Sequence, residues 1–178
     1  MKKQFTLTIF SENHYGLLNS ITIIFTRRKI NIYSLNTSES EIKGIYRYNI
    51  VITSTLEAAQ NVAKQIEKLI DVLGAFVYDE EDIIYREIAL YKVPTKSFHN
   101  GNEVEHLLRR HFARIIRLEK DYTVIEKTGH KDETQALMEE LQPYGLIEFV
   151  RSGRVAITKP MNHLDDHLEK LEKLSSIQ

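Results

Sequence analysis

The feature that most constrains the fold of this chain is a repeated alternation between two hydrophobic periods. Residues 4–10 alternate apolar and polar side chains, which is the pattern of a strand buried on one face. Residues 17–25 instead place their apolar side chains at helical spacing, and the basic residues 27–29 are typical of a helix end. The patterns that follow predict strands over 30–40, 45–53 and 72–78 and a helix over 59–70.

This order of strand, helix, strand, strand, helix and strand is that of ferredoxin-like domains. It predicts a four-stranded antiparallel sheet with both helices on one face. In the third strand we expect Tyr46, Tyr48 and Ile50 to point toward those helices, because alternate residues of a strand share a face.

The same order recurs after the acidic residues 79–82, which we interpret as a solvated link. We find no residue-level similarity between the halves, so the repeat is one of architecture. The chain is therefore expected to be α+β, with tandem ferredoxin-like units in residues 1–79 and 84–160. Leucines at helical spacing predict a short tail helix over 161–178. The second unit is predicted to have strands over 85–93, 113–118, 122–126 and 146–157, the last of them interrupted near Ser152 and Gly153, and helices over 104–111 and 134–141.

Composition excludes several classes of protein. The chain has 24 Lys and Arg against 25 Asp and Glu, a net charge of −1 that argues against coating of a polyanion. The absence of Cys excludes disulfides, thiolate zinc sites and cysteine nucleophiles. The start of the chain has no apolar leader, and no run of 18 apolar residues follows, so we expect a cytoplasmic protein that does not enter the membrane.

The sequence contains no recognisable catalytic motif, neither a nucleophile elbow nor a phosphate-binding glycine loop nor a zinc-protease pair of histidines. We therefore predict no catalytic residue. His163 and His167 are spaced to share one helix face, but a third ligand is missing. We interpret them as part of a polar helix and predict no metal site.

An RNA-binding module is the alternative from another functional class, because ferredoxin-like sheets also build RNA-recognition domains. Residues 43–48 loosely resemble the RNA-binding pattern of such domains. The aromatic positions of that pattern are held here by Ile45 and Arg47, however, and the tyrosines are out of phase. We therefore expect no base stacking and no nucleic-acid partner. A group of arginines in the second unit is interpreted as a solvated or subunit-facing surface: Arg109, Arg110, Arg114 and Arg117.

The first loop has the clearest potential to bind a ligand. Asn13 and Gly16 flank the start of the first helix, where backbone N–H groups attract a carboxylate, and Asn31 stands where the next strand begins. Two amide side chains could supply further donors and acceptors. A purely structural interpretation is also open, in which Asn13 caps the helix, Gly16 serves the turn and Asn31 sits in a bend.

Six segments resemble the small regulatory subunits of acetolactate synthase (acetohydroxyacid synthase), and the first three of them resemble the opening of an ACT domain. Together they follow the family's order over about 160 residues. The segments are residues 12–18, 25–28, 31–35, 68–72, 86–93 and 150–157.

The resemblance implies a non-catalytic subunit of branched-chain amino acid biosynthesis. Such a subunit binds a catalytic large subunit that carries thiamine diphosphate, magnesium and FAD, raises its activity, and confers feedback inhibition by valine. It also implies a homodimer in which ACT domains pair side by side and hold the amino-acid effector between two protomers. The second unit would assist assembly and contact the catalytic subunit. An ACT-type regulator of another enzyme is the alternative within this class.

The same resemblance assigns the effector site residue by residue. Asn13 and Gly16 match the loop positions that hold the effector, and Asn31 matches the position contributed by the neighbouring domain. Leu17 and Ile32 match positions beside the effector's side chain.

Two departures from the family's pattern stand close to these residues. Lys29 occupies a position where the family often has glycine, so we expect the turn there to form without a left-handed residue. His14 and Tyr15 replace smaller residues of the loop, so the affinity for the effector, or the preference among effectors, is expected to differ.

Overall fold

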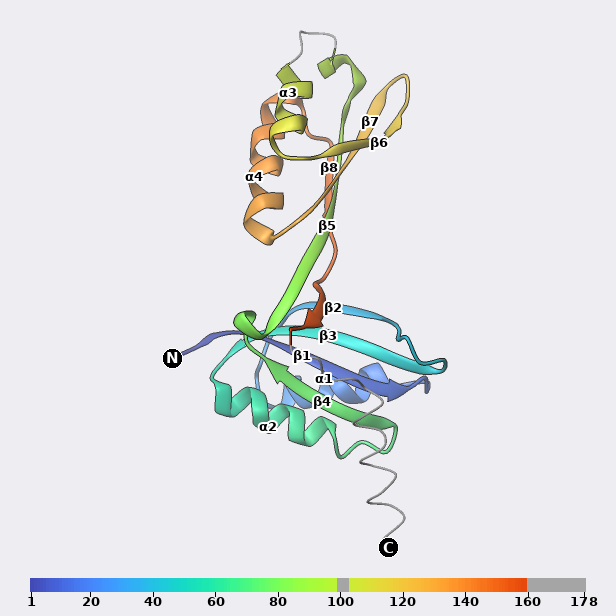
Figure 1. Ribbon diagram of the computed structural model, residues 1–178, viewed down its shortest axis with the longest axis vertical. Helices are drawn as coiled ribbons and strands as arrows, with labels where there is room; N and C mark the ends of the chain where they lie inside the picture. Colours follow the sequence, from blue (N-terminus) through green and yellow to red (C-terminus); the bar gives the residue numbers. More distant parts are fainter. Residues whose placement is uncertain (99–102, 160–178) are drawn as a thin grey trace, which may run out of the picture. The chain divides into compact units, whose positions relative to one another are not determined.

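The computed structural model describes residues 1–98 and 103–159 (Figure 1). Its contacts divide the chain into two compact units. The first unit contains Met1–Ile84 together with the segment that starts at Arg154, and the second contains Tyr85–Gly153. The boundaries at residues 79, 84 and 160 stay predictions, as does the tail over 161–178, which lies outside the described residues together with His163 and His167.

The first unit has the expected strand and helix order. Its sheet is antiparallel with the strand order β2-β3-β1-β4, and α1 and α2 lie on one face of it (Figure 1). The elements are β1 (Lys3–Glu12), α1 (Leu17–Arg27), β2 (Ile32–Glu39), β3 (Ile45–Ser54), α2 (Leu56–Ile66) and β4 (Val72–Tyr78).

The core of the first unit lies between this sheet and its two helices. In the pairing of β1 with β3, Leu7 is opposite Ile50 and Ile9 is opposite Tyr48, and all four side chains are buried. Tyr46 packs against the same cluster. The prediction that this face of β3 points toward the helices is confirmed, so these tyrosines do not lie on the open face where an RNA-recognition sheet stacks bases.

Helix α2 ends four residues earlier than its apolar pattern predicts. After Ile66 the chain tightens into shorter turns, in which the N–H of Leu69 donates to the carbonyl of Ile66 over 3.0 Å. Leu69 still packs against the core, whereas Ile70 is 99% exposed. Periodicity alone does not distinguish these cases, because Leu69 makes its contact from the turn that leads into β4.

The second unit repeats the architecture of the first. Its strands follow the order β6-β7-β5-β8, and α3 and α4 lie on one face of the sheet (Figure 1). The last predicted strand is divided at residues 152–154 into β8 and β9. The elements are β5 (Ile83–Pro94), α3 (Glu103–Arg110), β6 (Arg114–Leu118), β7 (Tyr122–Gly129), α4 (Lys131–Leu141) and β8 (Glu148–Arg151). Strand β9 (Val155–Thr158) follows Arg154 and belongs to the first unit.

Three of the acidic residues 79–82 are exposed, as the solvated interpretation predicts, but the segment is an ordered turn within the first unit. It forms a short 3₁₀ turn, η1 (Glu80–Asp82), that begins at Asp79. Asp79 forms an ion pair with Lys3 of β1. The Arg154 Nη2 donates to Glu80 Oε1 over 2.8 Å and to Gln4 Oε1 over 2.7 Å, and this arginine is buried. The acidic segment is therefore fastened to the first unit by cations that are distant in the sequence.

Helices α1 and α3 end in the same way, each with a non-glycine residue in the left-handed region. Lys29 has φ of 55° and Phe112 has φ of 51°. In both turns an N–H reaches back five residues, from Ile30 to Phe25 and from Ala113 to Leu108, which is the Schellman arrangement. The expectation that the turn at Lys29 forms without a left-handed residue is therefore wrong: Lys29 takes the conformation that glycine usually takes.

None of the helices within the described residues combines the length and the apolar character that a membrane-crossing segment requires.

Candidate functional site

The N-terminus of α1 is open to a ligand. Gly16 is its N-cap residue, with φ of 83°, and no side chain forms a capping hydrogen bond there. Asn13 is exposed and does not cap the helix, so the structural interpretation of this residue is wrong. Helix α2 differs, because the Thr55 hydroxyl accepts a hydrogen bond from the Ala58 N–H over 3.3 Å.

Glycine is favoured at position 16 by the backbone conformation and not by a lack of space for a side chain. A Cβ atom built at this position would meet no atom within 4 Å. The left-handed φ is therefore the reason for glycine, and the space beside the helix start is accessible. A helix N-terminus with exposed N–H groups and a positive dipole end suits a carboxylate.

His14 anchors the loop that carries Asn13 and Gly16. Its Nδ1 lies 2.6 Å from Asp71 Oδ1, and its Nε2 lies 3.8 Å from Glu12 Oε2. The Glu12 N–H also donates to the Asp71 carbonyl over 3.0 Å. The hydrogen bond and the charge of Asp71 raise the pKa of His14 above its usual value. The loop is thus tied to the segment that precedes β4.

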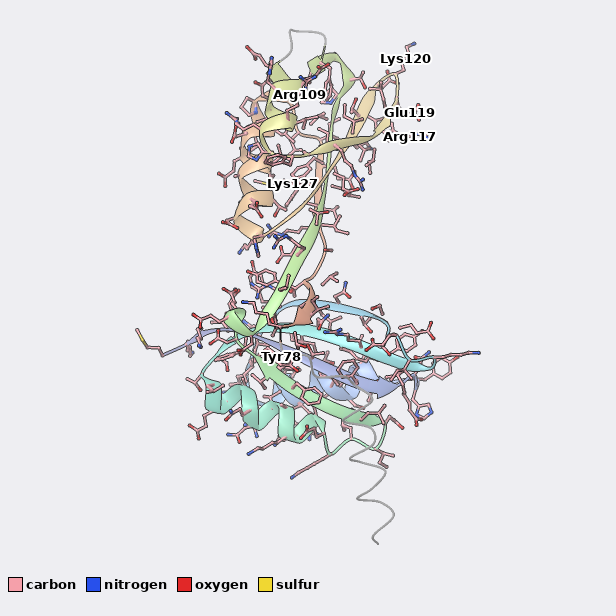
Figure 2. The ribbon with its side chains drawn as sticks, viewed as in Figure 1. Tyr78, Arg109, Arg117, Glu119, Lys120 and Lys127 are labelled. Atoms are coloured by element: carbon pink, nitrogen blue, oxygen red, sulfur yellow. The ribbon has the colours of Figure 1, made fainter. Side chains whose placement is uncertain are left out.

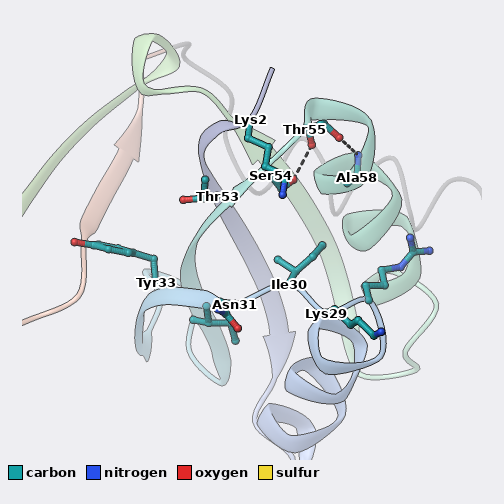
Figure 3. A pocket seen from close by; sticks show the side chains of 11 residues that line it. Lys2, Lys29, Ile30, Asn31, Tyr33, Thr53, Ser54, Thr55 and Ala58 are labelled. Carbon is teal, nitrogen blue, oxygen red and sulfur yellow. Dashed lines mark hydrogen bonds between the residues drawn. The ribbon is translucent and has the colours of Figure 1, made fainter.

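Asn31 and Ile32 lie at the other end of α1, beside a cavity of about 900 Å³ (Figure 3). The cavity is bounded by the end of α1, the start of β2, the start of β1 and the start of α2. Asn31 is exposed and Ile32 is half-buried. The other residues around the cavity are Lys2, Arg28, Lys29, Ile30, Tyr33, Thr53, Ser54, Thr55 and Ala58.

Within one chain the structure does not bring the predicted effector residues together. Helix α1 separates Gly16 from Asn31, and its eleven residues span roughly 16 Å at 1.5 Å per residue. Leu17 is 4% exposed and belongs to the core, so its side chain is not available to an effector in the single chain. Asn13 and Asn31 can serve one ligand only if they come from two chains.

Strand β2 offers an edge for such a second chain. It is the terminal strand of the β2-β3-β1-β4 sheet, so the backbone groups on its outer side have no strand partner within the described residues. Asn31 immediately precedes this strand. Unpaired strand edges are templates for pairing with another chain.

The arginines of the second unit do not form a free basic patch. Arg114 Nη2 lies 2.9 Å from Glu126 Oε2, and Arg117 Nη2 lies 2.5 Å from Glu119 Oε1. The other two, Arg110 and Arg109, face Glu140 and Glu105. Figure 2 shows Arg109 on α3 and Arg117 near the tip of the β6–β7 hairpin. Each positive charge thus has a carboxylate beside it, which suits the solvated or subunit-facing interpretation better than phosphate binding.

Two segments that carry the family resemblance meet in the second unit. Glu87 of β5 is almost fully buried, and its Oε2 lies 3.3 Å from Arg151 Nε of β8. The Ile88 N–H donates to Ser152 Oγ, and the Ser152 N–H donates to the Ile88 carbonyl, over 2.9 and 2.8 Å. The segment 86–93 and the first residues of the segment 150–157 therefore meet where β5 pairs with β8.

The sequence interpretation missed three residues at these sites. Lys2 and Arg28 line the cavity beside Asn31, although the basic run was interpreted only as a helix end. The partner of His14, Asp71, is 57 residues away, and no local pattern connects them. Among residues 1–98 and 103–159, no three His, Asp or Glu side chains are grouped as a metal site would require.

Comparison with known proteins finds a matching family model for each of the two units. A family model described as the AHAS small subunit-like ACT domain matches residues 7–74, and one described as the small subunit of acetolactate synthase matches residues 86–160. The acetolactate synthase small subunit of Bacillus subtilis is 33% identical over 160 residues, which cover 89% of this chain and 91% of that protein. That of Mycolicibacterium smegmatis is 31% identical and covers 86% of this chain and 90% of its own length.

A solved structure agrees with these matches. The crystal structure of the acetolactate synthase small subunit from Thermotoga maritima superimposes with a TM-score of 0.80 and 26% sequence identity, covering 90% of this chain and 99% of its own. The predicted α+β fold with two tandem ferredoxin-like units is thereby confirmed. From these similarities along nearly the whole chain, we conclude that it belongs to the family of acetolactate synthase small subunits.

Proposed function

We propose that this chain activates the catalytic large subunit of acetolactate synthase and makes it sensitive to feedback inhibition by valine. Membership of the small-subunit family supports a regulatory role within that enzyme. The activation and the effector are the finer part of the proposal. Thiamine diphosphate, magnesium and FAD are part of the proposal as cofactors of the catalytic partner, as the resemblance to the small-subunit family implies.

The observation that supports an effector site is the uncapped N-terminus of α1. The effector carboxylate would accept hydrogen bonds from N–H groups near Gly16, and the exposed Asn13 amide would lie beside it. Asn31 of a second copy would bind the effector from the other side. Two copies pairing along β2 would place one such site at each of two symmetry-related positions, as a two-fold interface requires.

Regulation requires that the effector bind one arrangement of the paired copies more tightly than another. A site shared between two chains meets this requirement, because its two halves move relative to each other when the pairing changes. By linkage, the effect is reciprocal. If valine changes the affinity of this chain for the catalytic subunit by some factor, the catalytic subunit changes the affinity of this chain for valine by the same factor.

The test is copurification with the catalytic subunit, followed by acetolactate formation with and without valine, leucine and isoleucine. We expect activation by this chain and inhibition by valine. Asn13→Ala and Asn31→Ala should relieve inhibition while activation persists, whereas Asn61→Ala, an exposed asparagine on α2, should change neither.

Full valine inhibition of both site variants at wild-type valine concentrations would contradict the site. A chain that fails to bind the catalytic subunit, yet binds an amino acid, would instead be an ACT-type regulator of another enzyme. Acetolactate formation by the isolated chain would contradict a non-catalytic role.

A further inference from the structure

We propose that the cavity at the C-terminal end of α1 binds an oxyanion with at least two negative charges, of the phosphate ester or polycarboxylate class. We call it the basic cavity and define it by Lys2, Arg28, Lys29, Asn31, Ser54 and Thr55. It lies at the opposite end of α1 from Gly16 of the same chain. It shares Asn31 with the proposed effector site, but Lys2, Arg28 and Lys29 are not part of that site.

Three positive charges line the basic cavity, and no acidic residue does. Lys2 precedes β1, while Arg28 and Lys29 follow α1, so the fold gathers charges from two separate segments. The acidic residue in the first turn of α2, Glu57, is not among the lining residues. The site therefore concentrates positive potential in a concave surface, which is where a multiply charged anion is bound most strongly.

Within the described residues, these cations differ from the four arginines of the second unit discussed above in having no carboxylate partner. Within the described part of the chain, none of Lys2, Arg28 and Lys29 takes part in an ion pair. Arg109, Arg110, Arg114 and Arg117 all do. The chain as a whole has nearly equal numbers of acidic and basic residues, yet among its described residues no carboxylate pairs with these three cations.

The polar groups of the cavity complete a site for oxygen atoms. The Arg28 Nε donates to Gln65 Oε1 over 2.8 Å, which orients the guanidinium and leaves its Nη groups for a ligand. Thr55 accepts from the Ala58 N–H, so its own hydroxyl proton can be donated to a ligand (Figure 3). The Asn31 amide adds a further donor at the rim.

The volume of the cavity supports a ligand larger than an amino acid. At about 900 Å³ it lies near the upper end of the usual range for small-molecule pockets. The proposed effector site takes only Asn31 and Ile32 from the lining of this cavity, so Lys2, Arg28 and Thr55 have no role in that site.

The experiment is isothermal titration calorimetry of the full chain with pyrophosphate and, separately, with citrate at constant ionic strength. We expect saturable binding of at least one of them. Binding of pyrophosphate alone assigns the phosphate class, and comparable or preferential binding of citrate assigns the polycarboxylate class. Absence of saturable binding by either anion would overturn the proposal.

Charge removal makes the test specific to the cavity. Lys2→Gln, Arg28→Gln and Lys29→Gly should each weaken binding about threefold, and the triple variant on the order of thirtyfold. Glycine is chosen at Lys29 because it keeps the left-handed turn while removing the charge. Lys43→Gln, in the turn before β3, is the matched control and should not change binding. Unchanged affinity in a folded triple variant would contradict the site.

This proposal can fail independently of the proposed function. Asn13→Ala should abolish the response to valine and leave pyrophosphate or citrate binding unchanged, because Asn13 is uncharged and does not line the basic cavity. Loss of anion binding in Asn13→Ala would contradict two distinct sites.

Discussion

His14 Nδ1 lies 2.6 Å from Asp71 Oδ1, and this contact joins the loop of the proposed effector site to the segment before β4. The two residues are far apart in the sequence, so the contact holds the loop only in the folded chain. Since Asp71 raises the pKa of His14, protonation of the imidazole strengthens the tie. The geometry of the helix start at Gly16 should therefore depend on pH.

The first prediction follows from the sign of that shift. The pKa of His14 is raised in the folded chain. The charged hydrogen bond between His14 and Asp71 is therefore fully formed below pH 6.5, the usual pKa of histidine, and is lost as the pH rises through the higher pKa of the folded chain. We expect valine to bind the isolated chain more tightly at pH 6 than at pH 8.5. His14→Gln and Asp71→Asn should remove this difference, whereas His106→Gln, on α3, should retain it. An unaltered pH dependence in His14→Gln would contradict the role of the tie.

The second prediction concerns the two left-handed residues. Lys29→Gly and Phe112→Gly should each stabilise the chain by about 0.5–1 kcal/mol, since glycine adopts positive φ without the clash that a Cβ causes. Phe112 is 92% exposed, so its removal loses little packing. Urea denaturation of each variant measures the effect. Lys29→Ala and Phe112→Ala retain the Cβ and should give no such gain; equal stabilisation by alanine would contradict the argument.

The third prediction tests a buried hydroxyl in the second unit. The Tyr91 hydroxyl donates to the Thr134 carbonyl over 2.7 Å, and burial raises the pKa of Tyr91 well above its usual value of 10. Tyr91→Phe should cost about 1–2 kcal/mol, because the carbonyl loses its partner. Above pH 10 the unfolded chain releases the proton more readily than the folded chain does, so wild-type stability falls with pH. Denaturation from pH 9 to 11 should show a smaller fall in Tyr91→Phe.

The fourth prediction concerns the ion pair between Glu87 and Arg151. Arg151→Ala leaves an almost fully buried carboxylate without this partner and should destabilise the chain by about 3 kcal/mol. The double variant Glu87→Gln with Arg151→Met should be less destabilised than Arg151→Ala alone. Arg109→Ala removes an exposed arginine 4.0 Å from Glu105 and should cost less than about 0.5 kcal/mol. Similar losses for Arg109→Ala and Arg151→Ala would refute the role of burial.

The fifth prediction distinguishes a site shared between two copies from one within a single chain. In a dimer formed from Asn13→Ala and Asn31→Ala chains, one site carries both substitutions and the other carries neither. An equal mixture of the two variants, unfolded and refolded together, should regain about a quarter of the wild-type valine sites, although each variant alone binds none. Calorimetric stoichiometry measures this recovery, and its absence would argue that the two asparagines do not serve the same ligand from different chains.

Much of the fold was predictable because it depends on local periodicity. The alternation around Tyr48 and Ile50 identifies the buried face of β3, and the spacing of Leu17, Ile21 and Phe25 identifies the buried face of α1. The end of α2 was not predictable in this way, because Leu69 contacts the core from a turn and continues the helical pattern. The left-handed turn at Lys29 was missed because lysine only rarely takes that conformation.

The candidate site was predictable only in part. Asn13, Gly16 and Asn31 stand out because each is placed at the boundary of an element, and the structure confirms those boundaries. The contacts of His14 with Asp71, and the assembly of Lys2 with Arg28 around a cavity, depend on segments that only the folded sheet brings together. Such pairs have no local sequence signal, so they can be found only in the structure.

The return of the chain to the first unit at Arg154 makes the second unit an insertion in topological terms, entered after Ile84 and left after Gly153. A fragment cut at residue 84 would therefore lack Arg154, the buried arginine that binds Gln4 and Glu80. A deletion of residues 85–153 with the two flanks rejoined would instead keep Arg154 together with the first unit. Evolutionary or engineered exchange of the second unit must accordingly splice the gene at two points.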